Sequence, residues 1–181
     1  MSNNDIGNNV IEMKTEKETM MKTNEMNTEV RREYYENGQK EWEGSYKNGK
    51  LEGIYTAWYK NGQKECEGNF KDGRLDGLWT KWYENGQKKN EENYKDGRLE
   101  GLYLEWYENG QKKVERNFKD RKNDGLWTKW YETGEKECEG NYKDGKEDGI
   151  FTKWYETGEK EFEWNFKDGK EVSVEWFGHF L

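Results

Sequence analysis

Hydrophobic and polar positions recur along this chain with a period of 24 residues, starting at Tyr34. The segment from Trp58 to Lys81, WYKNGQKECEGNFKDGRLDGLWTK, shows the pattern, in which aromatic and charged residues alternate between glycines. Later copies begin at Trp82, Trp106, Trp130 and Trp154. There are five full copies over 34–153 and a shortened sixth over 154–177. A fixed period of this length indicates stacked units that bury their apolar side chains only against their neighbours.

Each copy contains two alternating segments separated by turn residues. The segment 53–59 is followed by Asn61-Gly62, a dipeptide that favours a hairpin because both residues tolerate positive φ. The next segment, 63–71, is followed by two Asp-Gly pairs, which indicate a second turn. Every strand is then joined locally to the next. The pattern predicts an all-β fold: an elongated, single-layer antiparallel meander of repeated β-hairpins with about twelve strands.

Side-chain parity predicts two different faces. Neighbouring residues of a strand point to opposite sides, and a period of 24 is even, so each position keeps its face in every copy. We expect the even positions to form the apolar face of a sheet with one wet side. They hold Tyr or Phe at 46, 70, 94, 118, 142 and 166, Ile or Leu at 54, 78, 102, 126 and 150, and a structural aromatic ladder of Trp58, Trp82, Trp106, Trp130 and Trp154.

The same parity sets the length of the turns. If even positions must face even positions across a hairpin, each loop must contain an odd number of residues, because a slip of one residue would reverse the faces. We therefore predict a three-residue loop at Asn61-Gly62 that ends in a left-handed glycine with a bulge, instead of a two-residue turn.

Composition favours a thin structure. Only 30% of the 181 residues are hydrophobic and 39% are charged, with a mean hydropathy of -1.54, but 16% are aromatic. The ordering energy must then come from aromatic side chains in a sheet without a thick core. The net charge of -8 argues against a nucleic-acid partner and against anionic membrane surfaces.

The ends of the chain lack the repeat. We predict a disordered or partly helical leader over 1–33, the alternative being a short helix that covers the first sheet edge. Residues 178–181 form a C-terminal tail that either folds over the last strand or frays. The sequence has no run of 18 apolar residues and no signal-peptide pattern, so we expect a cytoplasmic location.

The repeated motifs W-Y-E-N-G-Q-K, E-G-N-F-K-D-G-K and D-G-I-F-T-K-W-Y resemble the MORN-repeat family, specifically its bacterial variant. The resemblance covers 34–177 and recurs six times. It implies an elongated sheet of hairpins that serves as an interaction module, and an antitoxin-like role, because relatives of this variant are often described as antitoxins of toxin–antitoxin systems. Other members of the family are linked to phospholipids and to scaffolding. The sequence departs from the motif at Glu92, Arg116 and Trp164, where the motif has Gly, and at Arg121 in a turn.

Catalytic and metal-binding chemistry finds little support, and we expect neither enzymatic activity nor a cofactor. His179 is the only histidine and lies in the tail, whereas acid–base catalysis usually needs a positioned imidazole or a tuned carboxylate. The Asp-Gly pairs lack the spacing of a calcium loop. Cys66 and Cys138 occupy the same position three copies apart, roughly 29 Å from each other at about 4.8 Å per strand, so we expect two free thiols.

The function predicted from the sequence is a non-catalytic repeat scaffold that binds another protein through an aromatic-rich sheet surface. The alternative is a peripheral membrane module that binds phospholipids. We also expect that the end strands could support self-association. The partner surface is predicted from aromatic residues at odd positions, which lie among charges: Tyr55, Tyr59, Trp79, Tyr83, Tyr103, Tyr107, Trp127, Tyr131, Phe151 and Tyr155.

Overall fold

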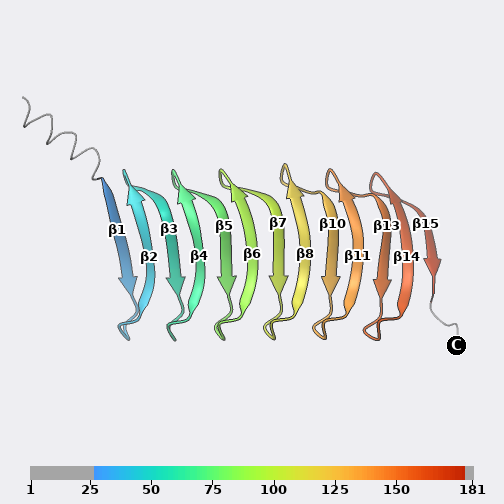
Figure 1. The fold of residues 1–181 in the computed structure, drawn as a ribbon, viewed down its shortest axis with the longest axis horizontal. Coiled ribbons are helices and arrows are strands. Elements are labelled where there is room, and N and C mark those ends of the chain that lie inside the picture. The colour runs from blue at the N-terminus through green and yellow to red at the C-terminus, as the bar shows by residue number, and fades with distance from the viewer. Residues whose placement is uncertain (1–26, 178–181) are drawn as a thin grey trace, which may run out of the picture.

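A computed structural model describes residues 27–177 and shows a single antiparallel sheet, drawn in Figure 1. No helix occurs in this part of the chain, and the all-β meander is confirmed. The strands are β1 (Thr28–Tyr34), β2 (Lys40–Lys47), β3 (Lys50–Trp58), β4 (Lys64–Lys71), β5 (Arg74–Trp82), β6 (Lys88–Lys95), β7 (Arg98–Trp106), β8 (Lys112–Lys119), β9 (Lys122–Asn123), β10 (Gly125–Trp130), β11 (Lys136–Lys143), β12 (Lys146–Glu147), β13 (Gly149–Trp154), β14 (Lys160–Lys167) and β15 (Lys170–Trp176).

Apart from the short strands β9 and β12, which pair only with β8 and β11, the strands lie in chain order and each pairs with its neighbours in that order, so β1 and β15 form the two edges of a single layer (Figure 1). The sheet has fifteen strands instead of the predicted twelve. One additional strand is β1, and the other two arise because Asp124 and Asp148 interrupt strands that are continuous in the earlier repeats.

The predicted leader over 1–33 is wrong for residues 28–33, which belong to β1. All seven side chains of β1 are exposed, so the strand is ordered by backbone pairing with β2 and leaves little apolar signal in the sequence. The rest of the predicted leader, 1–26, and the tail 178–181 lie outside the described residues.

The turns at the two ends of the strands differ. At one edge, Lys47 pairs with Lys50 across a two-residue turn in which Asn48 and Gly49 have φ values of 51° and 76°. Such positive values at both positions are typical of a type I′ turn. Asp-Gly occupies this turn in later repeats, except that Arg121, with φ 64°, replaces the glycine in one of them.

The opposite edge carries the predicted three-residue loops. In the loop between β3 and β4, the Tyr59 amide donates to the Gln63 carbonyl at 2.8 Å, and the Gly62 amide donates to the Tyr59 carbonyl at 2.9 Å. Gly62 has φ 85°, the left-handed conformation that glycine adopts at low cost. The prediction of a loop that ends in a left-handed glycine is confirmed.

One additional residue in each repeat reverses the predicted faces. Trp58 pairs with Lys64, but Ala57 pairs with Cys66, so Glu65 is bulged out of the ladder. The two-residue turn at the other edge preserves this odd offset, and Gly68 pairs with Trp79. Even positions of one strand therefore face odd positions of the next, and the prediction of an all-even apolar face is wrong.

The sheet accordingly has two faces that mix even and odd positions. We name the side that carries Tyr55, Gly68 and Trp79 the aromatic face. The other side carries Thr56 and Glu67 in register with each other, and we name it the stripe face. Within residues 27–177, neither face is covered by a second layer. The buried hydrophobic side chains among the described residues are Ala57, Phe151 and Phe162, with 8%, 5% and 8% of their surface exposed.

Candidate functional site: the two faces of the sheet

Rings on the aromatic face lie flat over glycines of the neighbouring strands. Gly68 lies in register between Tyr55 and Trp79, whose ring centroids are 6.3 Å apart with an interplanar angle of 20°. A Cβ atom at Gly68 would lie 2.4 Å from the Trp79 ring. Gly140 has the same role between Trp127 and Phe151, and a Cβ atom there would lie 2.1 Å from Phe151. The glycines thus allow large rings to pack within a single layer.

A second row of rings packs edge-on against the first. Phe70 makes T-shaped contacts with Tyr55 and Trp79, each with centroids 6.0 Å apart. Phe151 contacts Tyr142 and Phe166 in the same way, at 5.4 and 5.3 Å. The expectation that the strand aromatics at odd positions are wet is therefore wrong. They are half-buried and, in the case of Phe151, buried, because the bulge places them opposite glycines or, for Tyr103, opposite Glu92 and Arg116.

The loop tyrosines of the predicted partner surface connect successive repeats. The Tyr59 hydroxyl donates to the Trp82 carbonyl at 2.8 Å, and Tyr83 donates to the Trp106 carbonyl at 2.9 Å. Tyr35, Tyr107 and Tyr131 make the same bond to the carbonyl 23 residues further along the chain. Because these hydroxyls are already occupied, they stabilise the stacking of repeats, and a role in partner binding stays a prediction.

The predicted tryptophan ladder lies on the stripe face, with lysines over its rings. Lys40 Nζ lies 4.7 Å from the ring centroid of Trp58, and Lys64 Nζ lies 5.5 Å from that of Trp82. The contact recurs over Trp106, Trp130 and Trp154. In each repeat the same lysine also forms an ion pair with a glutamate three residues further on, as Lys64 does with Glu67 at 2.6 Å. The ladder is therefore half-buried under neutralised charges.

The most exposed apolar row crosses the stripe face from Ile54 to Ile150, at even positions that side-chain parity assigns to the apolar face. We name it the aliphatic stripe. Each member lies one repeat after the previous one, and the exposed fractions are 62%, 48%, 41%, 57% and 60%. The residues are Ile54, Leu78, Leu102, Leu126 and Ile150. The periodic Ile and Leu were visible in the sequence, but the bulged residue that moves the row of Phe70 to the opposite face was not.

Asparagines alternate with the aliphatic residues along the stripe. Asn69 pairs in register with Ile54, and Asn93 with Leu78. The Asn93 side-chain amide donates to the Leu102 carbonyl at 2.8 Å, and Asn69 donates to the Asp76 carbonyl at 3.2 Å. These amides lie against the backbone, so they do not cover the aliphatic side chains beside them.

The centre of the aromatic face departs from the glycine pattern. Glu92 and Arg116 replace the glycines on either side of Tyr103. Glu92 accepts hydrogen bonds from the Asn90 side-chain amide and, at 2.5 Å, from the Tyr94 hydroxyl. The Arg116 guanidinium lies 4.4 Å from the Tyr103 ring centroid. A polar cluster therefore interrupts the rings in the third and fourth repeats.

Burial within this cluster changes the acidity of its tyrosines. Burial and the Glu105 carboxylate, which accepts the Tyr103 hydroxyl at 3.1 Å, raise the pKa of Tyr103 to about 12. Burial and the hydrogen bond to Glu92 raise the pKa of Tyr94 further. Both phenols are therefore held in the neutral form.

A comparison with known protein families finds a match along most of the sheet. The model described as MORN repeat variant matches six repeats, at residues 30–48, 51–72, 75–96, 99–120, 123–144 and 147–168. The chain belongs to the MORN repeat variant family. No curated protein matches the sequence.

The MORN matches define a repeat unit that differs in frame from the one chosen at Trp58. The match at 51–72 contains β3, the three-residue loop and β4, so each MORN unit is a hairpin that ends at a two-residue turn. In this frame the first match is the short one, and β15 lies beyond the last match.

Both MORN-repeat cysteines are free thiols, as predicted. Each is half-buried on the aromatic face. Burial raises the pKa of the Cys66 thiol to about 11, and it has the same effect on Cys138. The thiols are therefore packed and protonated instead of being reactive thiolates.

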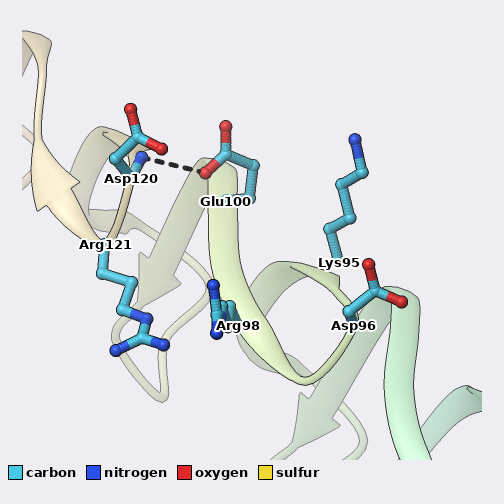
Figure 2. Close-up of a pocket in the computed structure, with 6 residues that line it drawn as sticks. All are labelled: Lys95, Asp96, Arg98, Glu100, Asp120 and Arg121. Atoms are coloured by element: carbon cyan, nitrogen blue, oxygen red, sulfur yellow. Dashed lines mark hydrogen bonds between the residues drawn. The ribbon is translucent and has the colours of Figure 1, made fainter.

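A hollow in the described structure lies between two-residue turns of the central MORN repeats (Figure 2). It has a volume of about 540 Å³ and is open to solvent. Figure 2 shows its six side chains spread around the rim, with the Asp120 amide donating to Glu100 at 3.1 Å. The lining consists of Lys95, Asp96, Arg98, Glu100, Asp120 and Arg121. The three basic and three acidic side chains balance in charge, so the hollow favours neither an anionic nor a cationic ligand.

Two further searches cover the described part of the chain. Residues 27–177 contain no cluster of three or more His, Cys, Asp or Glu side chains that could hold a metal ion. They also contain no helix of the length and apolarity needed to cross a membrane.

Proposed function

We propose that this MORN-repeat protein is a non-catalytic scaffold that binds another protein along the aliphatic stripe. The observation that carries the proposal is the exposure of five aliphatic side chains, 41% to 62% each, at one per repeat along one face. An ordered apolar row of this kind on a protein surface is typical of an interaction site. The aromatic face is a weaker candidate, because its rings already bury one another.

The spacing of the stripe favours an α-helical partner. Its side chains repeat every two strands, about 9.6 Å apart at ~4.8 Å per strand. A helix rises about 10.5 Å over seven residues, so one apolar residue per heptad matches one stripe residue per repeat. Five stripe residues span four intervals, roughly 38 Å in total, which corresponds to about four heptads of helix. The partner is therefore an amphipathic helix with an apolar residue at every seventh position.

The surroundings of the stripe suit such a partner. The asparagine amides are satisfied by backbone carbonyls, as in the bond from Asn93 to Leu102. The adjacent lysines and glutamates are paired, as in the 2.7 Å ion pair between Lys112 and Glu115. A partner that covers the stripe would bury few unpaired polar groups, which is the main cost of forming such an interface.

The antitoxin-like role suggested by resemblance is one form of this function. In that form, the partner is a toxin, and the aliphatic stripe binds a helix that the toxin needs for its activity. A cytoplasmic location belongs to the same proposal, and the two protonated free thiols are consistent with a reducing compartment.

A phospholipid surface is the second candidate, because the same exposed Ile and Leu side chains would also enter a membrane interface. The net charge of -8 opposes attraction to anionic lipid. Co-sedimentation with vesicles of phosphatidylserine and phosphatidylcholine separates the two candidates. Binding to vesicles that is lost with the stripe would support the lipid reading over the protein reading.

The test uses two variants with matched substitutions. The stripe variant carries Ile54→Asn, Leu78→Asn and Leu102→Asn, since asparagine already occupies alternate positions of the row. The control carries Lys81→Asn, Lys129→Asn and Lys153→Asn on the aromatic face, in the row that already contains Asn90. A protein captured by the native chain and the control, but not by the stripe variant, supports the proposal. Equal capture by all three would overturn it.

A further inference from the structure

The two edge strands of the sheet differ in their protection. On β1, Arg31 pairs with Glu29, and Arg32 pairs with Glu43 at 3.0 Å. Charged side chains on an edge oppose pairing with another strand. On β15, Val172, Val174 and Trp176 are 64%, 44% and 63% exposed. These three apolar side chains lie beside the charges of Lys170, Glu171 and Glu175, whereas β1 exposes only Val30 and Tyr34 among its paired charges. The outer edge of β15 has no neighbour among the described residues.

We propose that β15 pairs with β15 of a second copy of this chain, so that two sheets join into one continuous antiparallel sheet. This dimer is independent of the stripe and of its partner. Three features of the edge lead to it: the direction of the strands, the backbone groups that point outward, and the side chains that meet.

Strand direction favours β15 over β1 as the partner edge. β1 and β15 point the same way, as Figure 1 shows. A second copy could therefore place its β1 against β15 in antiparallel fashion only with its faces reversed. A two-fold rotation about the sheet normal instead brings two β15 strands together antiparallel, with both aromatic faces on the same side. This contact is isologous and closes after two copies.

The outward backbone groups limit the register. The Phe177 amide donates to the Glu161 carbonyl at 3.0 Å, and Glu163 pairs with Glu175. Because hydrogen-bonded residues alternate along an antiparallel strand, Phe177 and Glu175 direct their backbone groups toward β14. Val174 and Trp176 direct theirs toward solvent. Only registers that place Val174 or Trp176 opposite one of these same residues in the second copy can form hydrogen bonds.

Side-chain pairing selects one register among these. With Val174 opposite Val174 of the second copy, Glu175 meets Ser173, and Trp176 comes beside Val172, the bulged residue of β15. With Val174 opposite Trp176, Glu175 would lie opposite Glu175, and like charges directly opposite are destabilising. With Trp176 opposite Trp176, the overlap within β15 is shorter. The structure therefore favours a two-fold axis through the Val174 pair.

Cysteine cross-linking tests this register in the full chain. Paired residues on the axis have Cα atoms about 5.5 Å apart, within the range for a disulfide. We expect the Val174→Cys variant to form a disulfide-linked dimer under mild oxidation. The Glu175→Cys variant should give at least tenfold less of this dimer. Native Cys66 and Cys138 are half-buried and contribute the same background to both. Preferential linking of Glu175→Cys, or equal linking of both, would overturn the register.

Mass measurement tests the dimer itself. Light scattering should give twice the 21.9 kDa of the chain, and Val174→Lys should raise the dissociation constant at least tenfold, because two lysines would meet on the axis. Val30→Lys on the β1 edge is the matched control and should leave the mass unchanged. A monomeric native chain, or loss of the dimer in the Val30→Lys control alone, would overturn the proposal. Circular dichroism confirms that each variant is folded.

Discussion

The two faces of this sheet carry apolar side chains in similar numbers but with opposite outcomes. On the aromatic face, rings are long enough to reach across a glycine to the next repeat, as Tyr55 and Trp79 do across Gly68. On the stripe face, Ile54 and Leu78 are separated by an asparagine and are too short to meet, so they stay 62% and 48% exposed. A single-layer sheet can therefore be stabilised by one face and present its other face to a partner.

Filling a glycine on the aromatic face should have the largest effect on stability. A Cβ atom in Gly140→Ala would lie 2.1 Å from Phe151, and overpacking of this kind costs roughly 2–3 kcal/mol in the free energy of unfolding. Chemical denaturation measures it. Phe151→Ala removes the Cγ atom and the ring that the new Cβ would meet, so the loss in the double variant should be smaller than the sum of the two single losses. Strict additivity of the two substitutions would show that the ring does not lie over Gly140.

The turn at Asp120-Arg121 belongs to neither face and separates turn strain from face packing. Arg121 has φ 64°, a left-handed conformation that costs a non-glycine residue about 1 kcal/mol. Arg121→Gly should therefore raise the free energy of unfolding by about 1 kcal/mol. Thermal and chemical denaturation check the result, with Gly97→Arg in the preceding turn expected to do the reverse. A destabilised Arg121→Gly variant would contradict the account of this turn.

Alkaline pH should act through the aromatic face. Burial raises the pKa of Tyr103 from an ordinary value of 10.0 to about 12, so above pH 10 the unfolded chain releases a proton that the folded chain retains. The free energy of unfolding should fall as pH rises from 10 through 12. The slope should be smaller in Tyr103→Phe, while Tyr94 and other half-buried tyrosines contribute equally to both proteins. Identical slopes in the two proteins would show that Tyr103 is solvated.

The stripe should be nearly silent in stability measurements. Because the five side chains are exposed, with 41% to 62% of their surface in contact with solvent, Ile54→Asn, Leu78→Asn and Leu102→Asn should each change the free energy of unfolding by about 0.5 kcal/mol or less. Chemical denaturation of the three single variants is the check. A loss of 2 kcal/mol or more, roughly the value for a core position, would show that the stripe is buried in solution.

The sequence was sufficient to predict the meander, the three-residue loops and the free thiols, because Asn-Gly, Asp-Gly and the 24-residue period state them directly. It was insufficient for the faces. Glu65 is an ordinary polar residue at a strand position, and nothing in its chemistry marks it as bulged. One such residue per repeat reverses the side chains of the strand that follows it, and the two-residue turn then returns the next strand to the original parity. The available signal was the size match of Gly68 with Trp79, which only a pairing of even with odd positions explains.

The two residues that replace glycine in the central repeats were visible in the sequence, but the contacts that they make were not. Glu92 and Arg116 stood out as replacements for glycine. Their surroundings depend on register, which places both beside Tyr103 and brings Asn90 and Tyr94 to the same carboxylate. The exposed edge at β15 was likewise undetermined, because its pairing partner depends on which backbone groups point outward.

The most direct test of the central claim is binding of a designed helix to the stripe. The probe is a fluorescent 28-residue amphipathic peptide with leucine at every seventh position, titrated with the full chain by fluorescence anisotropy. The account predicts saturable binding that weakens at least tenfold in the triple stripe variant and is unchanged in the triple lysine control. Equal binding to the stripe variant, or loss of binding only in the aromatic-face control, would contradict the assignment of the stripe as the partner surface.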